Sequence, residues 1–397
     1  MAANDLTFEQ VATILTAIAD QATGTTNLVP TDTASFMTLA TTTLKTGYDP
    51  IMNAISCVMN ETIFSIRPYE MKFRLITRDK STYGMHTRKI NYIDSPVSDD
   101  DAYDATALTD GSSVDHYTVH KPKVIQTNFY GEDAFKDYIT IFENQLDVAF
   151  TGVDQFAEFI SGVLQNIDDK ITQVLEGGNR ATLLNMIGGT IQLNGSNVIH
   201  LLTEYQADTG NSTITQSNYK SEAEFPYFAK WVVARIEQIS NLMTERSLNF
   251  HSSFTGAPIM RHTPKEYQRA MFYAPLLTFM RTNMLADAFN QGDLQLVDHE
   301  MVNYWQSIDT PASIDVRPSW LDATGAVTEL DVGDPDVTTD YLFGVLFDVE
   351  ALGATVFNER MASTPLNASG LYTNLYFHHL RRWWNDYSEN FVVFLLD

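Results

Sequence analysis

Apolar residues recur at helical spacing over one unusually long stretch of the chain. From Val153 to Leu175 they follow the 3.6-residue period of an amphipathic helix. Thr151 suits the start of this helix and Gly177-Gly178 its end, so the pattern predicts a helix about 36 Å long at roughly 1.5 Å per residue. Its apolar positions include Phe156, Phe159, Ile160, Val163, Ile167 and Ile171.

Three other segments carry the signals that begin a helix. Thr7 and Gln10 have the spacing of a capping box, and apolar residues follow them at helical spacing. Pro226 stands at a good first-turn position ahead of a second amphipathic pattern that runs to Met243. The segment Thr263–Glu266 combines an N-cap residue, a proline and a glutamate, so we expect a third helix to begin there.

Other segments have the composition of strands. Tyr341–Phe347, Leu371–Phe377 and Phe391–Leu396 are rich in aromatic and β-branched residues, and the last run predicts that the end of the chain belongs to a sheet. Gly188–Lys220 is rich in Gly, Asn, Ser and Thr around a strand-like Val198–Leu202, so we expect hairpins and a loop there. Helices and strands mixed in this way predict an α+β fold.

Two further segments differ from these elements in composition. Thr23–Thr46 contains ten threonines with Gly24 and Pro30, and it has too few large apolar residues to form its own core. We interpret it as an extended arm that lies on another surface. The stretch Pro311–Asp340 is acidic and typical of turns.

The sign of the charge reverses within one part of the chain. Seven basic residues stand against two acidic ones in the first part: Arg67, Lys72, Arg74, Arg78, Lys80, Arg88 and Lys89. Seven aspartates follow without a Lys or Arg between them: Asp94, Asp99, Asp100, Asp101, Asp104, Asp110 and Asp115. Met71–Leu75 and Lys123–Thr127 have strand character on either side, so the pattern predicts a long hairpin with an acidic tip.

The basic run allows three interpretations: a solvated hairpin, a nucleic-acid patch, or an arm that docks on the acidic face of a neighbouring copy. Lys and Arg total 25 against 50 Asp and Glu, and the net charge of −25 repels phosphate backbones. Opposite potentials, in contrast, bring subunits together in register. Docking on a partner copy is therefore the favoured interpretation.

The composition also limits the class of protein. With 44% hydrophobic and 12% aromatic residues the chain is a packed globular protein. A single cysteine, Cys57, allows no internal disulfide. The first residues lack the charged start of a signal peptide, and no window is apolar enough to span a membrane, so we expect a product that is cytosolic at synthesis and has no membrane partner.

Searching for catalytic chemistry gives no candidate. The sequence lacks the glycine-rich phosphate motifs, the nucleophile elbow and the zinc-binding H-E-x-x-H pattern. The aspartates at 99–104 lack the spacing of a calcium loop, and His378 and His379 fall on opposite faces of a strand, so we expect no metal site. Cys57 has apolar neighbours and is expected to be inert. We predict no enzymatic activity and no cofactor.

The order of these features resembles the major capsid proteins of tailed phages, the Johnson-fold capsid family, with the closest likeness to short-tailed podovirus capsids. Ser369–His379, followed by the aromatic and basic Leu380–Trp384 and the Phe391–Leu396 run, is similar to that family's aromatic C-terminal strand pair. Phe129–Asp133, leading through Leu146–Phe150 into the helix at Val153, is similar to its passage from extended loop to spine helix.

This resemblance implies a division of the chain into four parts. Residues 1–66 would form an N-terminal arm and 67–130 an extended loop, a long β-hairpin whose charged residues contact adjacent subunits. Residues 131–221 and 341–390 would form a peripheral domain around the spine helix. Residues 222–340 and 391–397 would form an axial domain that gathers copies around five-fold and six-fold axes.

The resemblance also implies partners. The chain would self-assemble into pentamers and hexamers of an icosahedral virion head, built in the host cytoplasm with a portal protein and enclosing double-stranded DNA. An acidic wall suits this role because it does not hold phosphates. A Lys/Glu-rich scaffolding extension is absent ahead of the hairpin, and no Lys–Asn cross-linking pair can be matched, so we predict a separate scaffolding protein and non-covalent shells. A decoration protein is a further partner that the resemblance allows.

Two alternatives remain at this stage. An encapsulin-like nanocompartment shell protein would share the fold, and neighbouring terminase and portal genes would distinguish a phage protein from it. An acidic cytosolic hydrolase would instead remain a monomer at high concentration. A tail or fibre protein would show repeats or heptads, and the sequence has neither.

Overall fold

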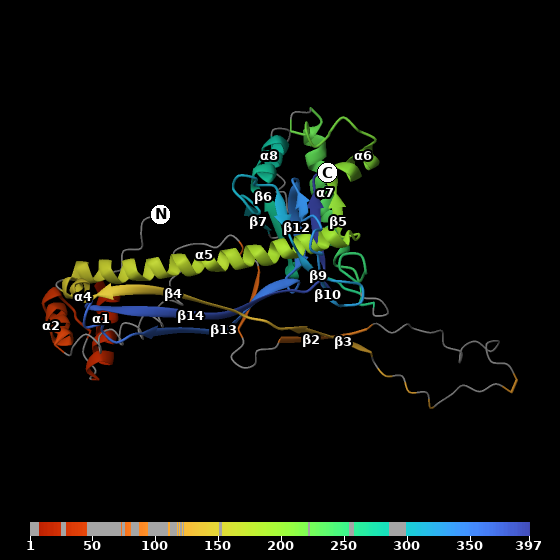
Figure 1. The fold of residues 1–397 in the computed structure, drawn as a ribbon. Helices are drawn as coiled ribbons and strands as arrows, with labels where there is room; N and C mark the ends of the chain where they lie inside the picture. The colour runs from red at the N-terminus through yellow and green to blue at the C-terminus, as the bar shows by residue number, and fades with distance from the viewer. Residues whose placement is uncertain are drawn as a thin grey trace.

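A long helix lying on a long sheet forms the body of the molecule, and a compact lobe stands at one end of it (Figure 1). A computed structural model describes residues 8–24, 29–45, 73, 76–80, 87–93, 110–111, 117, 119, 121, 123–150, 153–220, 223–253, 258–285 and 299–397. A two-stranded ribbon leaves the body near the lobe, whereas helices α1, α2 and α4 lie at the opposite end (Figure 1).

The spine of the body is α5 (Val153–Leu193), a helix of 41 residues and therefore about 60 Å long. The prediction that this helix ends at Gly177-Gly178 is wrong. A Cβ atom at Gly178 would lie 2.4 Å from the Trp383 ring, so this glycine permits close packing instead of ending the helix. Beyond it, buried apolar residues such as Leu183 and Ile187 anchor the continuing helix in the core.

The long sheet contains four strands in the spatial order β1-β13-β14-β4, and only β1 pairs in parallel. Their bounds are β1 (Thr77–Lys80), β13 (Leu352–Ser363), β14 (Tyr372–Asn385) and β4 (Asp133–Phe142). One face packs on α5, where Leu375 and Phe377 are buried and the Trp383 Nε1 donates a hydrogen bond to Asn179 Oδ1 at 3.0 Å. Buried and more open positions alternate along β14, so the residues between the buried ones face away from α5.

The lobe is built on a second sheet with five strands in the order β5-β15-β12-β6-β7. The strands are β5 (Val198–His200), β15 (Phe391–Leu395), β12 (Leu342–Asp348), β6 (Gln268–Tyr273) and β7 (His299–Val302), and the helices are α6 (Leu201–Thr209), α7 (Phe225–Leu242) and α8 (Ala274–Leu285). Phe343 and Leu346 of β12 pack towards α7 and α8, whereas Val345 and Phe347 pack towards the end of α5. Because apolar layers cover both faces, β12 is buried throughout.

The predicted C-terminal strands are confirmed as β12, β14 and β15, and the second predicted helix is confirmed as α7 with Pro226 in its first turn. The predicted helix at Thr263 is wrong, because only a 3₁₀ turn, η2 (Lys265–Tyr267), precedes β6. β6 pairs with strands on both sides, and its residues Ala270 and Phe272 are fully buried. Pairing within the sheet thus outweighs the local helix signal.

Residues 33–44 of the threonine-rich segment form a helix, so the prediction of an extended arm is wrong for these residues. Helix α2 (Thr33–Leu44) begins at a capping box in which the Ser35 backbone N–H donates to Asp32 Oδ1 at 2.7 Å. Several threonine hydroxyls donate to carbonyls four residues earlier, which satisfies them inside a helix. The predicted first helix is confirmed as α1 (Phe8–Thr23), and it packs with α2 against α5.

The connecting segments are shorter than the sequence predicts. Residues 188–193 belong to α5, and β5 and α6 follow, so the hairpins expected before Lys220 are absent from the described residues 188–220. Helix α4 (Glu143–Ala149) joins β4 to α5. The turn-rich segment after Pro311 is confirmed, with two small antiparallel pairs: β8 (Ile314–Val316) with β11 (Val337–Thr339), and β9 (Ser319–Leu321) with β10 (Val327–Glu329).

Candidate assembly surfaces

The projecting ribbon consists of β2 (Thr87–Tyr92) and β3 (Val124–Phe129), paired antiparallel. Thr87 and Phe129 pair at its base, Tyr92 and Val124 pair near its outer end, and the ribbon points away from the body (Figure 1). The predicted strand over 123–127 is therefore confirmed from residue 124. Its predicted partner, Met71–Leu75, is wrong, because β3 pairs with β2. Phe73 of that segment is instead fully buried between the end of α5 and the sheet of the lobe.

One face of the ribbon is exposed and partly apolar. Ile90, Tyr92 and Val124 are 54%, 69% and 52% exposed, and Arg88 lies on the same face. A two-stranded ribbon gains little stability by itself in water. Contiguous exposed apolar residues on such a ribbon mark a surface that another protein covers.

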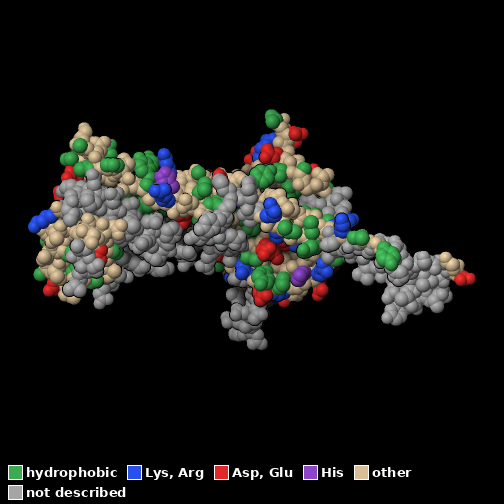
Figure 2. All heavy atoms as spheres, turned by 90° about the horizontal axis from the view of Figure 1, so that it is seen from below, with side chains coloured by type: hydrophobic (Ala, Val, Ile, Leu, Met, Phe, Trp, Pro, Cys, Tyr) green, Lys and Arg blue, Asp and Glu red, His purple; other side chains and the backbone are tan. Residues whose placement is uncertain are grey.

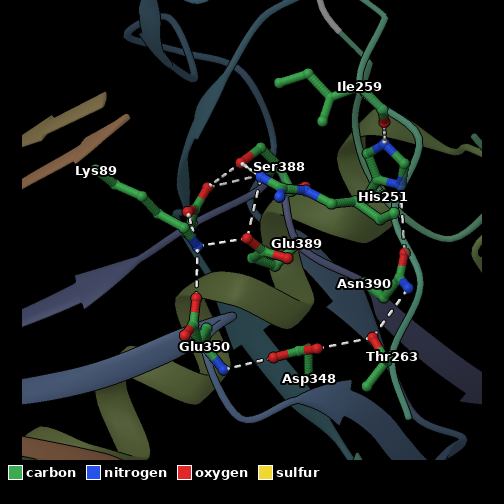
Figure 3. Close-up of polar contacts among 11 residues, drawn as sticks. Lys89, His251, Ile259, Thr263, Asp348, Glu350, Ser388, Glu389 and Asn390 are labelled. Carbon is green, nitrogen blue, oxygen red and sulfur yellow. Dashed lines mark hydrogen bonds and ion pairs between the residues drawn. The ribbon is translucent and has the colours of Figure 1, made fainter. Parts of the chain in front are cut away.

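An ion cluster fixes the base of the ribbon to the body (Figure 3). Lys89 Nζ lies 3.0 Å from Asp386 Oδ2 and 3.2 Å from Glu350 Oε2, and it also donates to Glu389 Oε1. Arg261 Nη2 lies 3.0 Å from the same Glu389 oxygen. Beside this cluster the Phe129 ring packs against Trp384 with centroids 5.1 Å apart.

The electrostatics of this cluster are unbalanced, because three carboxylates face two cations. Burial raises the pKa of Glu389 to about 7, although Lys89 and Arg261 act in the opposite direction. Burial by itself lowers the pKa of Lys89, but the charges of Asp386 and Glu389 outweigh it, so the pKa of Lys89 is raised. The lysine is therefore a permanent cation, and Glu389 is the group that titrates near neutral pH.

A second polar network continues from the cluster into the lobe (Figure 3). Asn390 Nδ2 donates to Thr263 Oγ1 at 3.0 Å, and the Thr263 hydroxyl donates to Asp348 Oδ2 at 2.7 Å. His251 lies 3.3 Å from Asn390 Oδ1 and 2.8 Å from the Ile259 carbonyl, and burial lowers the pKa of His251. Buried polar groups with satisfied partners stiffen the junction of lobe and ribbon.

The structure redistributes the charged residues that the sequence assigns to the hairpin. Arg78 and Lys80 lie on β1 of the long sheet and not on the ribbon, so their predicted place is wrong. Lys89 makes ion pairs within its own chain, and its contact with a neighbour stays a prediction. Arg88 remains exposed on the ribbon. The other predicted contacts lie outside the described residues: Arg67, Lys72, Arg74, Asp99, Asp100, Asp101 and Asp104, as does Cys57.

The predicted positions of the spine helix all fall within α5. Ile167 and Ile171 are buried and Phe159 is half-buried, whereas Phe156, Ile160 and Val163 have side chains outside the description. On β14, His379 is buried and His378 exposed, which confirms that the two histidines face opposite sides. Sequence reasoning missed Asp386 and Glu389, and the only signal was charge directly ahead of a buried strand.

Among the residues that the structure describes, no group of three or more His, Cys, Asp or Glu side chains has the arrangement of a metal site. None of the helices in these same parts of the chain combines the length and apolarity needed to cross a bilayer.

Comparison with solved structures identifies the fold. A chain in the capsid structure of Staphylococcus phage Andhra is 11% identical, with a TM-score of 0.51 over 82% of this chain and 83% of that one. A chain in the structure of head fibre and inner core protein gp22 of bacteriophage P68 is 12% identical, with a TM-score of 0.48 over 81% of this chain and 83% of that one. A chain in the mature capsid of bacteriophage PhiM1 is 12% identical, with a TM-score of 0.44 over 83% of this chain and 88% of that one. Curated proteins gave no match.

The Andhra superposition, with the spine helix, long sheet and ribbon, defines the class: the protein has the phage major capsid fold, the Johnson or HK97-like fold. The family follows from the sequence, because the model of the Phi29-like phage major capsid protein family matches residues 15–395. The chain belongs to that family. It is a structural protein of the virion that assembles with copies of itself, and neither the nanocompartment nor the hydrolase alternative is supported.

Proposed function

We propose that this capsid protein forms the pentamers and hexamers of an icosahedral head, and that the β2–β3 ribbon reaches over an adjacent subunit in each of them. The exposed face of the ribbon carries this proposal. Ile90, Tyr92 and Val124 have more than half of their surface open, and the ion cluster holds the ribbon away from its own body. A rigid projection with an apolar face is buried only when copies associate.

The proposal keeps the four parts of the chain but moves some elements between them. Strand β1 moves from the extended loop to the peripheral domain, which comprises α5 and the long sheet. Strands β5 and β12 and helix α6 move from the peripheral domain to the axial domain, which comprises the lobe. Residues 1–66 act as the arm, with α1 and α2 packed at the far end of α5. The five-stranded sheet and its three helices offer a compact wedge, a shape that suits packing around a symmetry axis.

The proposal includes several partners. They are a separate scaffolding protein, a portal protein, a decoration protein as an optional addition, and double-stranded DNA enclosed without sequence-specific binding. A net charge of −25 supports the last point, because an acidic wall lets a packaged polyanion slide. Assembly takes place in the host cytoplasm, and the chain acts without enzymatic activity.

The test of this function is a double substitution on the exposed face of the ribbon, Ile90→Asp with Tyr92→Asp. We expect the yield of closed particles to fall about tenfold or more, because two charges would be buried in the contact between subunits. Electron microscopy and sedimentation measure the particles, and circular dichroism of the soluble chain checks its fold.

A matched control places the same charges on exposed valines elsewhere, with Val327→Asp and Val332→Asp on the β9–β10 side of the lobe. These valines are 65% and 105% exposed, and the control should assemble like the unchanged chain. Normal particles from the ribbon variant would contradict the proposed docking of the ribbon.

A further inference from the structure

The face of the long sheet that points away from α5 carries no acidic side chain on β4 or β14. Even-numbered residues of these strands lie on this outer face, and none of them is Asp or Glu. The acidic residues point the other way: Asp137 lies 3.5 Å from Lys170 of α5, and Glu359 of β13 pairs with the buried Arg381. In a chain with 50 acidic residues this is a distinct electrostatic surface.

Three neighbouring strands place basic groups directly opposite one another on this face. His378 pairs in register with Lys136 on one side and with Arg360 on the other, and all three side chains are exposed. We call these three residues the basic row. Figure 2 shows histidine and basic side chains gathered beside hydrophobic ones on this part of the body.

Aromatic residues fix the basic row without neutralising it. Lys136 Nζ lies 5.9 Å from the Tyr376 ring centroid, and the His378 ring stacks on the same tyrosine at 6.3 Å. None of the three makes an ion pair with a residue that the structure describes. Adjacent strands lie about 4.8 Å apart, so two permanent cations stand about 10 Å apart with a histidine between them. The two cations repel each other across the intervening strand, and an anion that lies over the basic row would remove this repulsion.

We propose that the basic row receives the acidic segment 94–115 of a second copy of this chain. This segment contains seven aspartates and no Lys or Arg. Its negative charge would be repelled by most of an acidic protein, but the basic row offers a landing site without carboxylates. The inference rests on the proposed function, because it names the surface on which the hairpin of a neighbouring subunit docks.

The direction of the ribbon favours a second copy over the segment's own body. The Ile93 backbone N–H donates to the Lys123 carbonyl at 2.9 Å, so the ribbon is still paired where the acidic segment begins. The ribbon points away from the long sheet of its own chain (Figure 1), and Lys89 fixes its base to the body.

The first experiment reverses the charge of the basic row and that of the acidic segment, first in separate chains and then together in one chain. Lys136→Glu with Arg360→Glu should lower the particle yield about tenfold, because two attractive contacts become repulsive in every copy. Asp99→Lys, Asp100→Lys, Asp101→Lys and Asp104→Lys together should lower it similarly. A chain that carries both sets restores the complementary charges, and its yield should return to within about threefold of the unchanged chain.

The control for the basic row is Lys230→Glu with Arg246→Glu, which changes the net charge equally at exposed positions of the lobe. It should assemble normally. If the basic-row variant also assembles normally, the inference is wrong. The inference is also wrong if the basic-row variant gives few particles and the chain with both sets of substitutions does not recover the yield. In that case another polyanion, such as DNA or an acidic partner protein, occupies the basic row.

A second experiment tests whether the contact joins two copies. Chains with single cysteines at Asp99, Asp100, Asp101 or Asp104 are each assembled with an Arg360→Cys chain, all in a Cys57→Ser background, and treated with a short bis-maleimide. We expect a cross-linked dimer from mixed particles and none from either chain alone. Mixed particles that give no dimer from any of the four positions would refute the inference but leave the capsid function intact, whereas an unchanged chain that forms no shells would refute the function itself.

Discussion

Lys89 Nζ lies 3.0 Å from Asp386 Oδ2, and this contact joins the projecting ribbon to the turn that precedes the last strand. Asp386 is completely buried, and the neighbouring Glu389 is almost so. A buried carboxylate requires a cation, and the ribbon supplies it. The direction of the ribbon is therefore coupled to the folding of the lobe.

Replacement of Lys89 by Met should destabilise the unassembled chain by about 3–5 kcal/mol, because Asp386 would remain buried without this cation and Glu389 would keep only Arg261. Denaturant unfolding measures this change. Arg88→Met is the matched control, since Arg88 is adjacent but exposed, and it should change the unfolding free energy by about 0.5 kcal/mol or less. Equal effects of the two substitutions would show that the ion cluster does not stabilise the fold.

The stability of the protein should depend on pH through Glu389. Its pKa is raised from the ordinary value of 4.5 to about 7, so between these values the folded state keeps a proton that the unfolded chain releases. The unfolding free energy therefore falls as the pH rises through this window and becomes constant above it.

Glu389→Gln removes this titration, and the difference in unfolding free energy between unchanged protein and variant should fall by about 2–3 kcal/mol from pH 5 to pH 8. Burial lowers the pKa of His251, which acts in the opposite direction, but its contribution is common to both proteins and cancels. The prediction would be contradicted if the unfolding free energies of the unchanged protein and of Glu389→Gln changed with pH in parallel.

The two adjacent glycines of α5 should respond oppositely to alanine. A Cβ atom at Gly178 would lie 2.4 Å from the Trp383 ring, and the indole cannot move easily because its N–H is bonded to Asn179. Gly178→Ala should thus cost about 1–3 kcal/mol. Gly177 has open space at its Cβ position, and Gly177→Ala should stabilise the helix by about 0.5–1 kcal/mol. Thermal melting of both variants measures the contrast, and the same sign for both would be inconsistent with this packing.

Tyr387 should contribute through its hydroxyl group. The hydroxyl lies 3.1 Å from the Asn185 carbonyl of α5 and 3.0 Å from the Ser319 carbonyl of β9. It therefore links α5 to the β9–β10 side of the lobe. Tyr387→Phe should lower the unfolding free energy by about 1–2 kcal/mol. Tyr138→Phe is the control, because Tyr138 is exposed and its change should have no measurable effect. Two variants that melt alike would rule out this role.

The sequence predicted elements whose periodicity is strong and local. Helices α1 and α7, the start of α5 and strands β12, β14 and β15 follow directly from repeating apolar positions. The opposite orientation of His378 and His379 follows from strand geometry alone. The reversal of charge before and after residue 90 can also be read from the sequence alone, and the contact with a partner copy that it suggests stays a prediction.

Tertiary structure decided the positions where packing partners outweigh local preference. The helix signal at Thr263 gives way to β6 because two neighbouring strands take up its backbone hydrogen bonds. Gly177-Gly178 does not end α5, because buried residues beyond it, such as Leu183 and Ile187, anchor the helix in the core, and Gly178 is needed for close packing with Trp383. Lys89 became an anchor because Asp386, far away in sequence, is brought beneath it.

By itself, then, the sequence determined the α+β class, the main helical and strand periods and the uneven distribution of charge, since each depends on residues close together in the chain. Only the folded chain decided which charges neutralise one another and which remain open on a surface. The reason is that ion pairing and close packing depend on distances between residues that the sequence alone does not bring together.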